Sequence, residues 1–377
     1  MKFCCTLVLL LGLAMSWAGN VFLQLPEKIY AVPGVESNVY FDNIVLTPNS
    51  GNFIFDVDCA KGRNDEKRWR FTPGDGDVGE FDWKIRVSDG FKTVAEGTTR
   101  LVVVPKNAGA GKEISILVVG DSLTAASVYP ARIFTLSQGA ENPRLTMIGS
   151  NKRTPEGVRH EGFGGWTWKC FLTRVQDPPD PEKPRLITSR FLVKKDGKYV
   201  PDFQQYLNEY NGGKAPDYIT VMLGINDVVS AGDENLDERI KDILENADRL
   251  IEFFRTAAPA AIIGIGFPTP GAASQDAFGS NYRCGQTRWQ FRKNQHRLCA
   301  AMMEKFGKAK DPKISLIPTY VNLDCANNFP VRVEDVNAGN EQKITRQNNG
   351  VHPAPAGYNQ IGDTFYCWLK NQLNSGK

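Results

Sequence analysis

The sequence predicts an α/β domain built on a parallel sheet and preceded by a small all-β domain. Short, continuous apolar runs alternate with helical patterns in the second part of the chain, whereas short strands separated by turn residues fill the first part. The chain has 377 residues, of which 41% are hydrophobic. This length is too great for one ordinary domain and suits two packed cores.

The first residues, MKFCCTLVLLLGLAMSWAGN, have the pattern of a secretory signal peptide. Lys2 precedes an apolar run that ends at Ala14 and is too short to span a bilayer as a mature helix. Small residues before Ala18 fit a cleavage site after that residue. We therefore expect a signal peptide at residues 1–18, a secreted or periplasmic protein, and no membrane span in the mature chain. A buried N-terminal strand is the alternative.

Composition and cysteine spacing argue against several classes of protein. The net charge of +3 is small, and no basic cluster is interleaved with aromatic residues, so we expect no nucleic-acid partner. Removal of the signal leaves six cysteines, none in a CxxC pair, so we expect no metal. An oxidising compartment permits disulfides, but the spacing leaves their pairing open.

Residues 19–105 have the pattern of a β-sandwich. From Phe81 to Val87 apolar and polar residues alternate, which is the period of a half-buried strand. The stretch DVGEF at 77–81 resembles the D-x-G-x-Y turn of immunoglobulin-like domains, with phenylalanine in the tyrosine position. We therefore expect an immunoglobulin-like β-sandwich domain, followed by a flexible linker, KNAGAGK, at 106–112.

Residues 113–377 have the alternating pattern of an α/β domain. Apolar runs that suit strands buried on both faces lie at 114–119, 145–148, 218–223, 261–265 and 314–317. The clearest helical pattern runs from Ile240 to Phe254, with the apolar residues on one face. Strands alternating with helices predict a parallel sheet covered on both faces, with functional residues at the carboxyl ends of its strands.

Polar residues follow two of these buried runs. Ser122 comes directly after the first run, at a strand-to-helix turn whose free backbone N–H groups can bind an oxyanion. Asn226 follows the run at 218–223 and could donate a side-chain N–H to developing negative charge. The alternative for each is a plain helix start, with Ser122 acting only as an N-cap.

Two further clusters contain glycine and histidine. The sequence HEGFGGWT at 160–167 has paired glycines that let a ligand approach the backbone, although a plain turn is the alternative. The chain has three histidines, and His296 lies in a helical stretch crowded with Arg and Lys, so we expect it at the surface. Of His160 and His352, the latter lies in a proline-bounded loop, which favours it as a catalytic base.

In the order Ser122, Gly165, Asn226, His352, these clusters resemble the four blocks of the SGNH/GDSL hydrolase family, over residues 114–372. The resemblance implies a flavodoxin-like, three-layer α/β/α fold and a serine esterase without metal or cofactor. It implies that Ser122 is the nucleophile and His352 the base. It also implies an oxyanion hole formed by the backbone N–H groups of Ser122 and Gly165 and the side chain of Asn226.

One position departs from the family pattern. Asn349 stands three residues before His352, where the family has the aspartate that orients the imidazole ring. Asn349 remains a candidate for this role, but a backbone carbonyl or a carboxylate such as Asp324 or Asp335 could serve instead.

The substrate is predicted from location and from two tryptophans. Trp166 and Trp168 flank Gly165, and aromatic faces suit sugar rings, although core packing is the alternative. We therefore expect an exported esterase that removes O-acetyl groups from a carbohydrate or polysaccharide, or acts on a small ester. The alternatives are a lipase- or thioesterase-like hydrolase and a non-catalytic carbohydrate-binding protein with a degenerate hydrolase fold. Because no catalytic block precedes residue 114, we expect the β-sandwich to be dispensable for chemistry.

Overall fold

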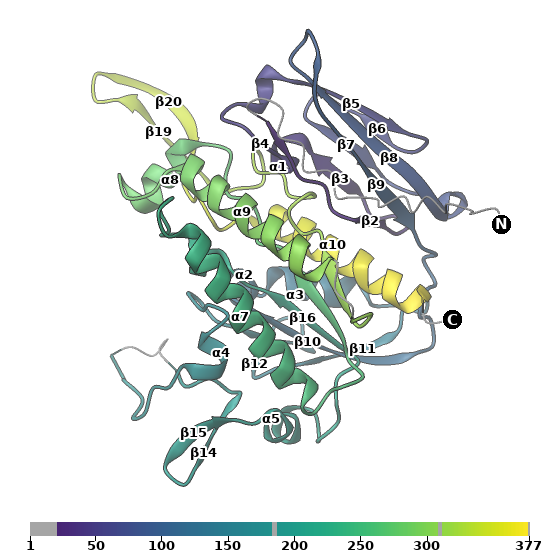
Figure 1. Ribbon diagram of the computed structural model, residues 1–377, viewed down its shortest axis with the longest axis vertical. Helices are drawn as coiled ribbons and strands as arrows, with labels where there is room; N and C mark the ends of the chain where they lie inside the picture. The colour runs from purple at the N-terminus through teal and green to yellow at the C-terminus, as the bar shows by residue number, and fades with distance from the viewer. Residues whose placement is uncertain (1–20, 183–186, 308–310, 376–377) are drawn as a thin grey trace, which may run out of the picture.

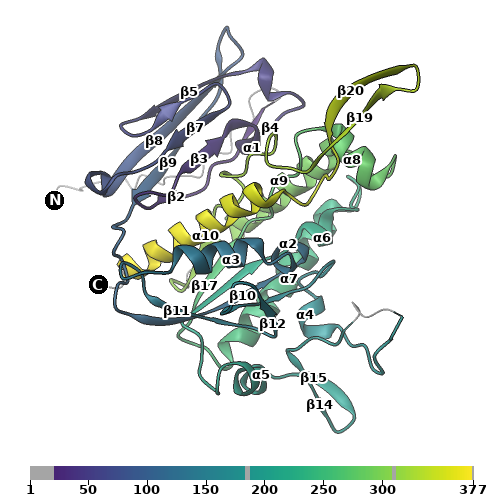
Figure 2. The ribbon, with the colours of Figure 1, turned by 180° about the vertical axis from the view of Figure 1, so that it is seen from behind.

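The computed structural model describes residues 21–182, 187–307 and 311–375. The predicted signal peptide at 1–18 lies outside the described residues. The chain forms an α/β part and a smaller N-terminal part, which we call the β-region (residues 21–105). The β-region lies against helices α9 (Arg288–Phe306) and α10 (Pro355–Ser375), as Figures 1 and 2 show from opposite sides.

The β-region contains several small sheets. A four-stranded sheet has the order β2-β9-β8-β5, and a three-stranded sheet has the order β3-β7-β6, while β1 pairs with β4. The elements are β1 (Phe22–Leu23), β2 (Lys28–Ala31), β3 (Ser37–Tyr40), α1 (Phe41–Ile44), β4 (Val45–Leu46), β5 (Ile54–Cys59), β6 (Arg63–Asn64), β7 (Arg68–Phe71), β8 (Gly79–Ser88) and β9 (Thr93–Val103). The all-β character is confirmed, and the immunoglobulin-like arrangement stays a prediction.

The α/β part is built on a seven-stranded sheet. Its order is β12-β13-β10-β16-β17-β18, with β11 also paired to β10. The five predicted apolar runs form β10 (Glu113–Gly120), β11 (Arg144–Ile148), β16 (Tyr218–Met222), β17 (Ile262–Gly266) and β18 (Ile314–Ile317). Neighbouring members of this set pair in parallel, which confirms the predicted sheet.

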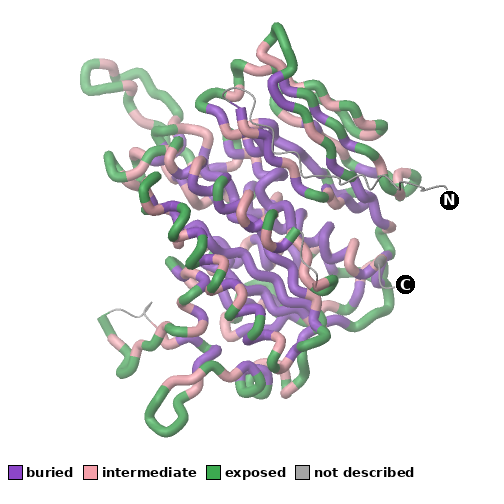
Figure 3. The backbone as a smooth tube through the Cα atoms, in the orientation of Figure 1, coloured by how far each residue is buried: buried purple, intermediate pink, exposed green. Residues whose placement is uncertain are grey.

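Helices cover both faces of this sheet. Ile116 and Val118 of β10 belong to one hydrophobic cluster with helices α3 (Val128–Leu136) and α10. Leu117 and Val119 point the other way and belong to a cluster with α7 (Leu236–Arg255) and α9. Because successive residues of a strand face opposite sides, this division gives the predicted three layers. Figure 3 shows the buried strands between the helices.

The remaining elements connect or flank these layers. They are β12 (Asn151–Arg153), β13 (Val158–Gly162), α2 (Ser122–Ala125), α4 (Cys170–Thr173), α5 (Phe203–Tyr210), α6 (Ile225–Val228), α8 (Gln275–Tyr282) and the hairpins β14–β15 (Leu192–Lys195, Lys198–Pro201) and β19–β20 (Val331–Asn337, Asn340–Gln347). The chain after Ser122 forms two short helices, α2 and α3, separated at Ser127, which has a φ of 68°. The hairpin β19–β20 projects from the body and is largely exposed (Figure 3).

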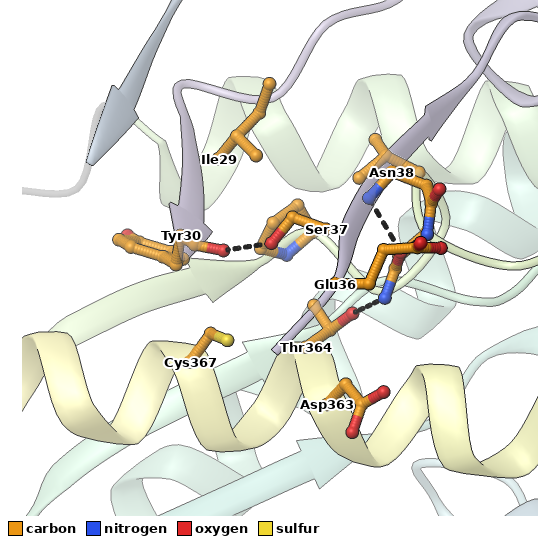
Figure 4. Close-up of a pocket in the computed structure, with 11 residues that line it drawn as sticks. Ile29, Tyr30, Glu36, Ser37, Asn38, Asp363, Thr364 and Cys367 are labelled. Atoms are coloured by element: carbon orange, nitrogen blue, oxygen red, sulfur yellow. Dashed lines mark hydrogen bonds between the residues drawn. The ribbon is translucent and has the colours of Figure 1, made fainter. Parts of the chain in front are cut away.

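The β-region meets the α/β part through buried polar contacts. Strands β2 and β3 face helix α10 (Figure 4). Asn38 donates its backbone and side-chain N–H groups to Oδ1 of Asn322, each at 2.9 Å. Asn322 in turn donates to Thr364 of α10 at 3.3 Å. Both asparagines are buried, and one hydrophobic cluster includes residues of both parts. Because buried amides need hydrogen-bond partners, each part satisfies polar groups of the other at this interface.

A second set of contacts joins helix α9 to the β-region. The side chain of Arg292 is only 5% exposed and donates to Oδ1 of Asp42 at 2.7 Å. It also donates to the backbone oxygens of Asp42 and Val45. His296, one turn further along α9, is buried, so the prediction that it lies at the surface is wrong. The arginine that suggested a solvated helix face pairs with the β-region instead.

Within the described residues, no helix is long and apolar enough to cross a membrane. In the same residues, no group of three or more His, Cys, Asp or Glu side chains is arranged to hold a metal ion. All six cysteines beyond the predicted signal peptide are free thiols in the structure.

Candidate active site

Ser122 and His352 lie in contact although 230 residues separate them. Nε2 of His352 is 2.9 Å from Oγ of Ser122, at the carboxyl end of the sheet. Both side chains are only partly buried, so the pair can be reached from solvent. Burial lowers the pKa of His352 below its usual value, which favours the neutral imidazole. The structure thus brings the two predicted residues together in a geometry that permits proton transfer.

The position of Ser122 follows from the two residues before it. Asp121 caps helix α2, because its Oδ1 accepts the N–H of Leu123 at 2.9 Å. A Cβ atom at Gly120 would lie 1.9 Å from Oγ1 of Thr124, so only glycine allows this tight strand-to-helix turn. Ser122 therefore starts the helix, where its own backbone N–H has no intrahelical acceptor.

The loop that carries Gly165 is hydrogen-bonded to the strand-to-helix turn at residues 120–122, which we call the serine turn. Phe163 donates its backbone N–H to the oxygen of Gly120 at 3.1 Å. Gly165 is exposed and has a φ of 74°, a conformation that favours glycine. Among the described residues its N–H has no acceptor, so this donor remains available to a ligand.

Asn226 lies at the start of helix α6 and is already hydrogen-bonded. Its Nδ2 donates to the backbone oxygen of Trp166 at 3.0 Å and to Oδ2 of Asp121 at 3.3 Å. These contacts place Asn226 beside both the Gly165 loop and the serine turn. Since both amide hydrogens are engaged, donation to an oxyanion requires one to be given up, and the longer bond to Asp121 is the weaker of the two.

The buried carboxyl groups of Asp121 and Asp227 lie beside Ser122 and Asn226. Neither was predicted from the sequence as a site residue. Burial raises the pKa of Asp121 to about 7. Burial also raises the pKa of Asp227 to about 7, and the nearby charge of Asp121 adds to this. Oδ2 of Asp227 is buried and has no hydrogen-bond partner among the described residues. The position of Asp121 could have been predicted from the sequence, because an aspartate just before a helix is a common N-cap.

Asn349 holds the histidine loop rather than the histidine ring. Its Oδ1 accepts the backbone N–H groups of Val351 at 3.1 Å and His352 at 2.9 Å. The oxygen therefore points toward the backbone of its own loop, and no contact with the ring is present. Asn349 was one of several candidates for orienting the imidazole, and in this structure it is bonded to its own loop instead.

The two carboxylates considered as substitutes for Asn349 are also engaged elsewhere. Oδ1 of Asp324 accepts the backbone N–H groups of the two residues Ala326 and Asn327, and Oδ2 accepts from Tyr40. Asp335 pairs with Lys343 on the exposed hairpin. Neither contacts His352, and within the described residues Nδ1 of His352 has no hydrogen-bond partner.

The predicted substrate-binding tryptophans are part of the core. Trp166 and Trp168 are 0% and 1% exposed. Trp166 packs edge-on against Phe171, with ring centroids 4.8 Å apart. Neither ring offers a face to solvent, so the structure favours the alternative of core packing over contact with a sugar.

His160 is a structural residue. It is fully buried, and Nδ1 accepts the N–H of Gly162 at 3.0 Å, so Nε2 carries the proton and contacts Oγ of Ser127 at 2.8 Å. Burial lowers its pKa to about 4, and Arg153 adds to the shift. A neutral ring with both nitrogens engaged cannot serve as the base, which leaves His352.

Solved structures resemble the chain only distantly. A family 3 carbohydrate esterase of Clostridium thermocellum is 17% identical with a TM-score of 0.42, covering 70% of this chain and 98% of that one. A carbohydrate esterase family 3 from Talaromyces cellulolyticus is 14% identical with a TM-score of 0.40, covering 70% and 99%. The lipase/acylhydrolase from Enterococcus faecalis is 14% identical with a TM-score of 0.34, covering 69% and 96%. No curated protein matches the chain.

A protein-family comparison covers most of the α/β part. The profile described as GDSL-like Lipase/Acylhydrolase matches residues 116–365, well over half of the chain. This range contains all four clusters, from Ser122 to His352. The chain belongs to the GDSL-like lipase/acylhydrolase family, as the sequence resemblance predicted.

Proposed function

We propose that this protein is an exported serine esterase in which Ser122 is the nucleophile and His352 the base. Its family is one of acylhydrolases. The observation that carries the proposal is the 2.9 Å contact between Nε2 of His352 and Oγ of Ser122. At this distance a neutral imidazole can take the hydroxyl proton, and the lowered pKa of His352 keeps the ring neutral near pH 7.

In the proposed reaction, His352 removes the proton of Ser122 while Oγ attacks the ester carbonyl. The backbone N–H groups of Ser122 and Gly165 and the side chain of Asn226 donate to the oxyanion. His352 then returns the proton to the leaving alcohol, and an acyl-enzyme remains. A water molecule that gives its proton to His352 hydrolyses this ester and regenerates Ser122.

We further propose that the acyl group is an acetyl group on a carbohydrate or polysaccharide. The predicted signal peptide at 1–18 supports this, because a secreted or periplasmic enzyme meets extracellular polymers. Trp166 and Trp168 give no further support, since both are buried.

The test is a chain-length series of p-nitrophenyl esters followed by acetylated polysaccharides, with Ser122→Ala as the control. We expect the acetate ester to be hydrolysed fastest and the polysaccharides to release acetate. Preference for long acyl chains would favour the lipase- or thioesterase-like alternative. If a serine-reactive phosphonate labels neither Ser122 nor any other residue, the protein is a non-catalytic carbohydrate binder instead.

A further inference from the structure

A cleft of about 640 Å³ lies between the β-region and the α/β part. On one side it is bounded by α1, the loop at 48–53, and the turn at 65–68. On the other side it is bounded by Arg288 and the loop at 324–327. Neither Ser122 nor His352 lines it. Its volume falls within the range of small-molecule sites, roughly 300–1,000 Å³.

Aromatic rings line the β-region side of this cleft. The rings of Phe41 and Phe55 stack with centroids 4.7 Å apart and an angle of 13° between their planes. Phe41 is buried, whereas Phe53 and Phe55 are only half-buried and keep part of their surface open. Exposed aromatic surface of this kind suits the C–H faces of a sugar ring, and it would be costly to leave in water without a ligand.

Planar polar groups surround the aromatic rings and are held in place by other protein groups. Asp42 is fixed by Arg288 at 2.8 Å and by Arg292. Asp324 is fixed by backbone N–H groups of its own loop. Nε of Arg288 is buried without an acceptor among the described residues. Such preorganised carboxylates and guanidinium groups bind hydroxyl groups without a large loss of side-chain entropy.

The charges that line the cleft nearly balance. Carboxylates are contributed by Asp42, Asp65, Glu66 and Asp324, and cationic groups by Lys67, Arg68 and Arg288. A strongly charged ligand would meet a like charge on one side or the other. The lining therefore favours an uncharged ligand with many hydroxyl groups over an acidic polymer or a charged peptide.

The loop that forms one wall of the cleft also supports the catalytic histidine loop. Nε2 of Gln347 donates to the backbone oxygens of Cys325 and Ala326, which line the cleft, at 2.8 and 2.9 Å. Ala354, two residues after His352, donates its N–H to the oxygen of Asn328 at 2.9 Å. The wall of the cleft is therefore hydrogen-bonded to the segments on either side of His352.

We propose that this cleft is a second binding site, which holds uncharged sugar units of the polymer whose ester is presented to Ser122. The proposal rests on the proposed action on carbohydrate esters. The site binds the unmodified part of the chain through Phe53, Phe55 and the surrounding polar groups. It contributes to polymer binding and takes no part in bond cleavage.

The experiment measures binding of neutral hexasaccharides to the full chain by isothermal titration calorimetry. The probes are cellohexaose, xylohexaose and mannohexaose, which carry no ester and cannot be turned over. We expect at least one to bind wild type and Phe53→Ala to weaken that binding about tenfold. The matched control is Phe91→Ala, because Phe91 lies in the same region, is 99% exposed and does not line the cleft.

A second variant, Glu66→Ala, distinguishes loss of a binding contact from misfolding of the protein. Glu66 is exposed and has no ion-pair partner within the described part of the chain, so Glu66→Ala should fold normally. We expect it to weaken hexasaccharide binding by about three- to tenfold through loss of a hydrogen-bond acceptor. Hydrolysis of p-nitrophenyl acetate should be unchanged in both cleft variants, while KM for an acetylated polysaccharide should rise.

The outcomes separate this proposal from the proposed function. If no hexasaccharide binds wild type, or if Phe53→Ala and Glu66→Ala bind as well as Phe91→Ala, the second site is disproved. If a hexasaccharide binds in the cleft but Ser122→Ala does not change ester hydrolysis, the site stands and the assignment of Ser122 fails. Binding of a decanoate chain in place of sugars would also overturn the proposal, since it would identify an acyl-chain site.

Discussion

The Ser122–His352 pair and the Arg292–Asp42 pair each join distant parts of the chain, but they are held in opposite ways. Ser122 and His352 are each positioned by their own short motif, through Asp121 capping its helix and Asn349 accepting the N–H of His352. The Arg292 side chain instead crosses to the β-region and ends on its backbone oxygens. The Ser122–His352 pair is partly exposed, while Arg292 is almost fully buried.

We expect the Ser122–His352 pair to affect catalysis and the Arg292–Asp42 pair to affect the stability of the fold. A partly exposed hydroxyl with a single side-chain contact can be removed with little effect on folding. A buried guanidinium that loses its carboxylate leaves an uncompensated charge inside the protein. Substitutions of the first pair should therefore lower turnover, whereas substitutions of the second pair should lower the free energy of unfolding.

The largest effect is expected for Ser122→Ala. Loss of the nucleophile should reduce kcat/KM for p-nitrophenyl acetate by about 10³–10⁶, as in other serine hydrolases. The melting temperature should stay within a few degrees of wild type, because among the described residues the Oγ of Ser122 is hydrogen-bonded to His352 alone. Activity that survives the substitution would disprove the assignment.

Asn226→Ala should lower kcat by about 10²–10³ with little change in KM, as for loss of one oxyanion donor. Steady-state kinetics on the same ester provide the measurement. A rise in KM with unchanged kcat would instead identify Asn226 as a substrate-binding residue. Asn226 also donates to Trp166 and Asp121, so the substitution could affect folding. The melting temperature of the variant must therefore be measured as well.

Asp42→Ala should act on stability rather than on turnover. We expect the free energy of unfolding to fall by about 2–3 kcal/mol, below the value for a fully buried pair because Asp42 is 31% exposed. Urea denaturation of wild type and variant gives this difference. Asp56→Ala is the matched control, since Asp56 is exposed in the same region and should change stability by less than about 0.5 kcal/mol.

The effect of Asp42→Ala should also depend on pH. Burial raises the pKa of Asp42, but the charges of Arg292 and Arg288 outweigh it and lower the pKa overall. A carboxyl group with a lowered folded-state pKa stabilises the protein above its unfolded pKa, which is 3.8 here. The advantage of wild type should therefore disappear as pH falls through the folded-state value. A difference that persists in acid would mean that packing, and not charge, carries it.

Asn349→Ala should cost less than about tenfold in kcat, whereas His352→Ala should nearly abolish turnover. The reason is that Asn349 holds the loop backbone and does not contact the imidazole ring. If both substitutions are equally damaging, the amide orients the ring in the working enzyme.

The smallest effect concerns the pH profile. Burial lowers the pKa of His352, so the acid limb of kcat/KM should have its midpoint below 6.5, the ordinary value for histidine. A midpoint above 6.5 would show that a negative charge stabilises the imidazolium in the free enzyme.

Much of the α/β part could be predicted because its signals are local. The strand β10 and the turn at Ser122 can be recognised from residues that are adjacent in the sequence, and the apolar runs show which strands are buried on both faces. Ser127 has a φ of 68° at the break between α2 and α3, and its side chain contacts His160, 33 residues away, which a local pattern cannot show.

The interface with the β-region could not be predicted in the same way. Arg292 and His296 lie on a helix whose charged residues are typical of a solvated face, and only the position of Asp42 reveals what Arg292 contacts. The same holds for Trp166 and Trp168, because an aromatic residue beside a catalytic glycine can equally face a ligand or the core. For Arg292 the deciding contact is with a residue 250 positions away in the chain.

The burial of two of the three histidines gives the enzyme a built-in spectroscopic reporter. Burial lowers the pKa of His160 to about 4 and that of His296 to about 3, so both rings stay neutral over the range in which histidines usually titrate, about pH 5–8. The imidazole expected to titrate nearest this range in a proton NMR experiment is that of His352. The protonation state of the proposed base can therefore be followed directly in the unmodified protein, with and without a bound ligand.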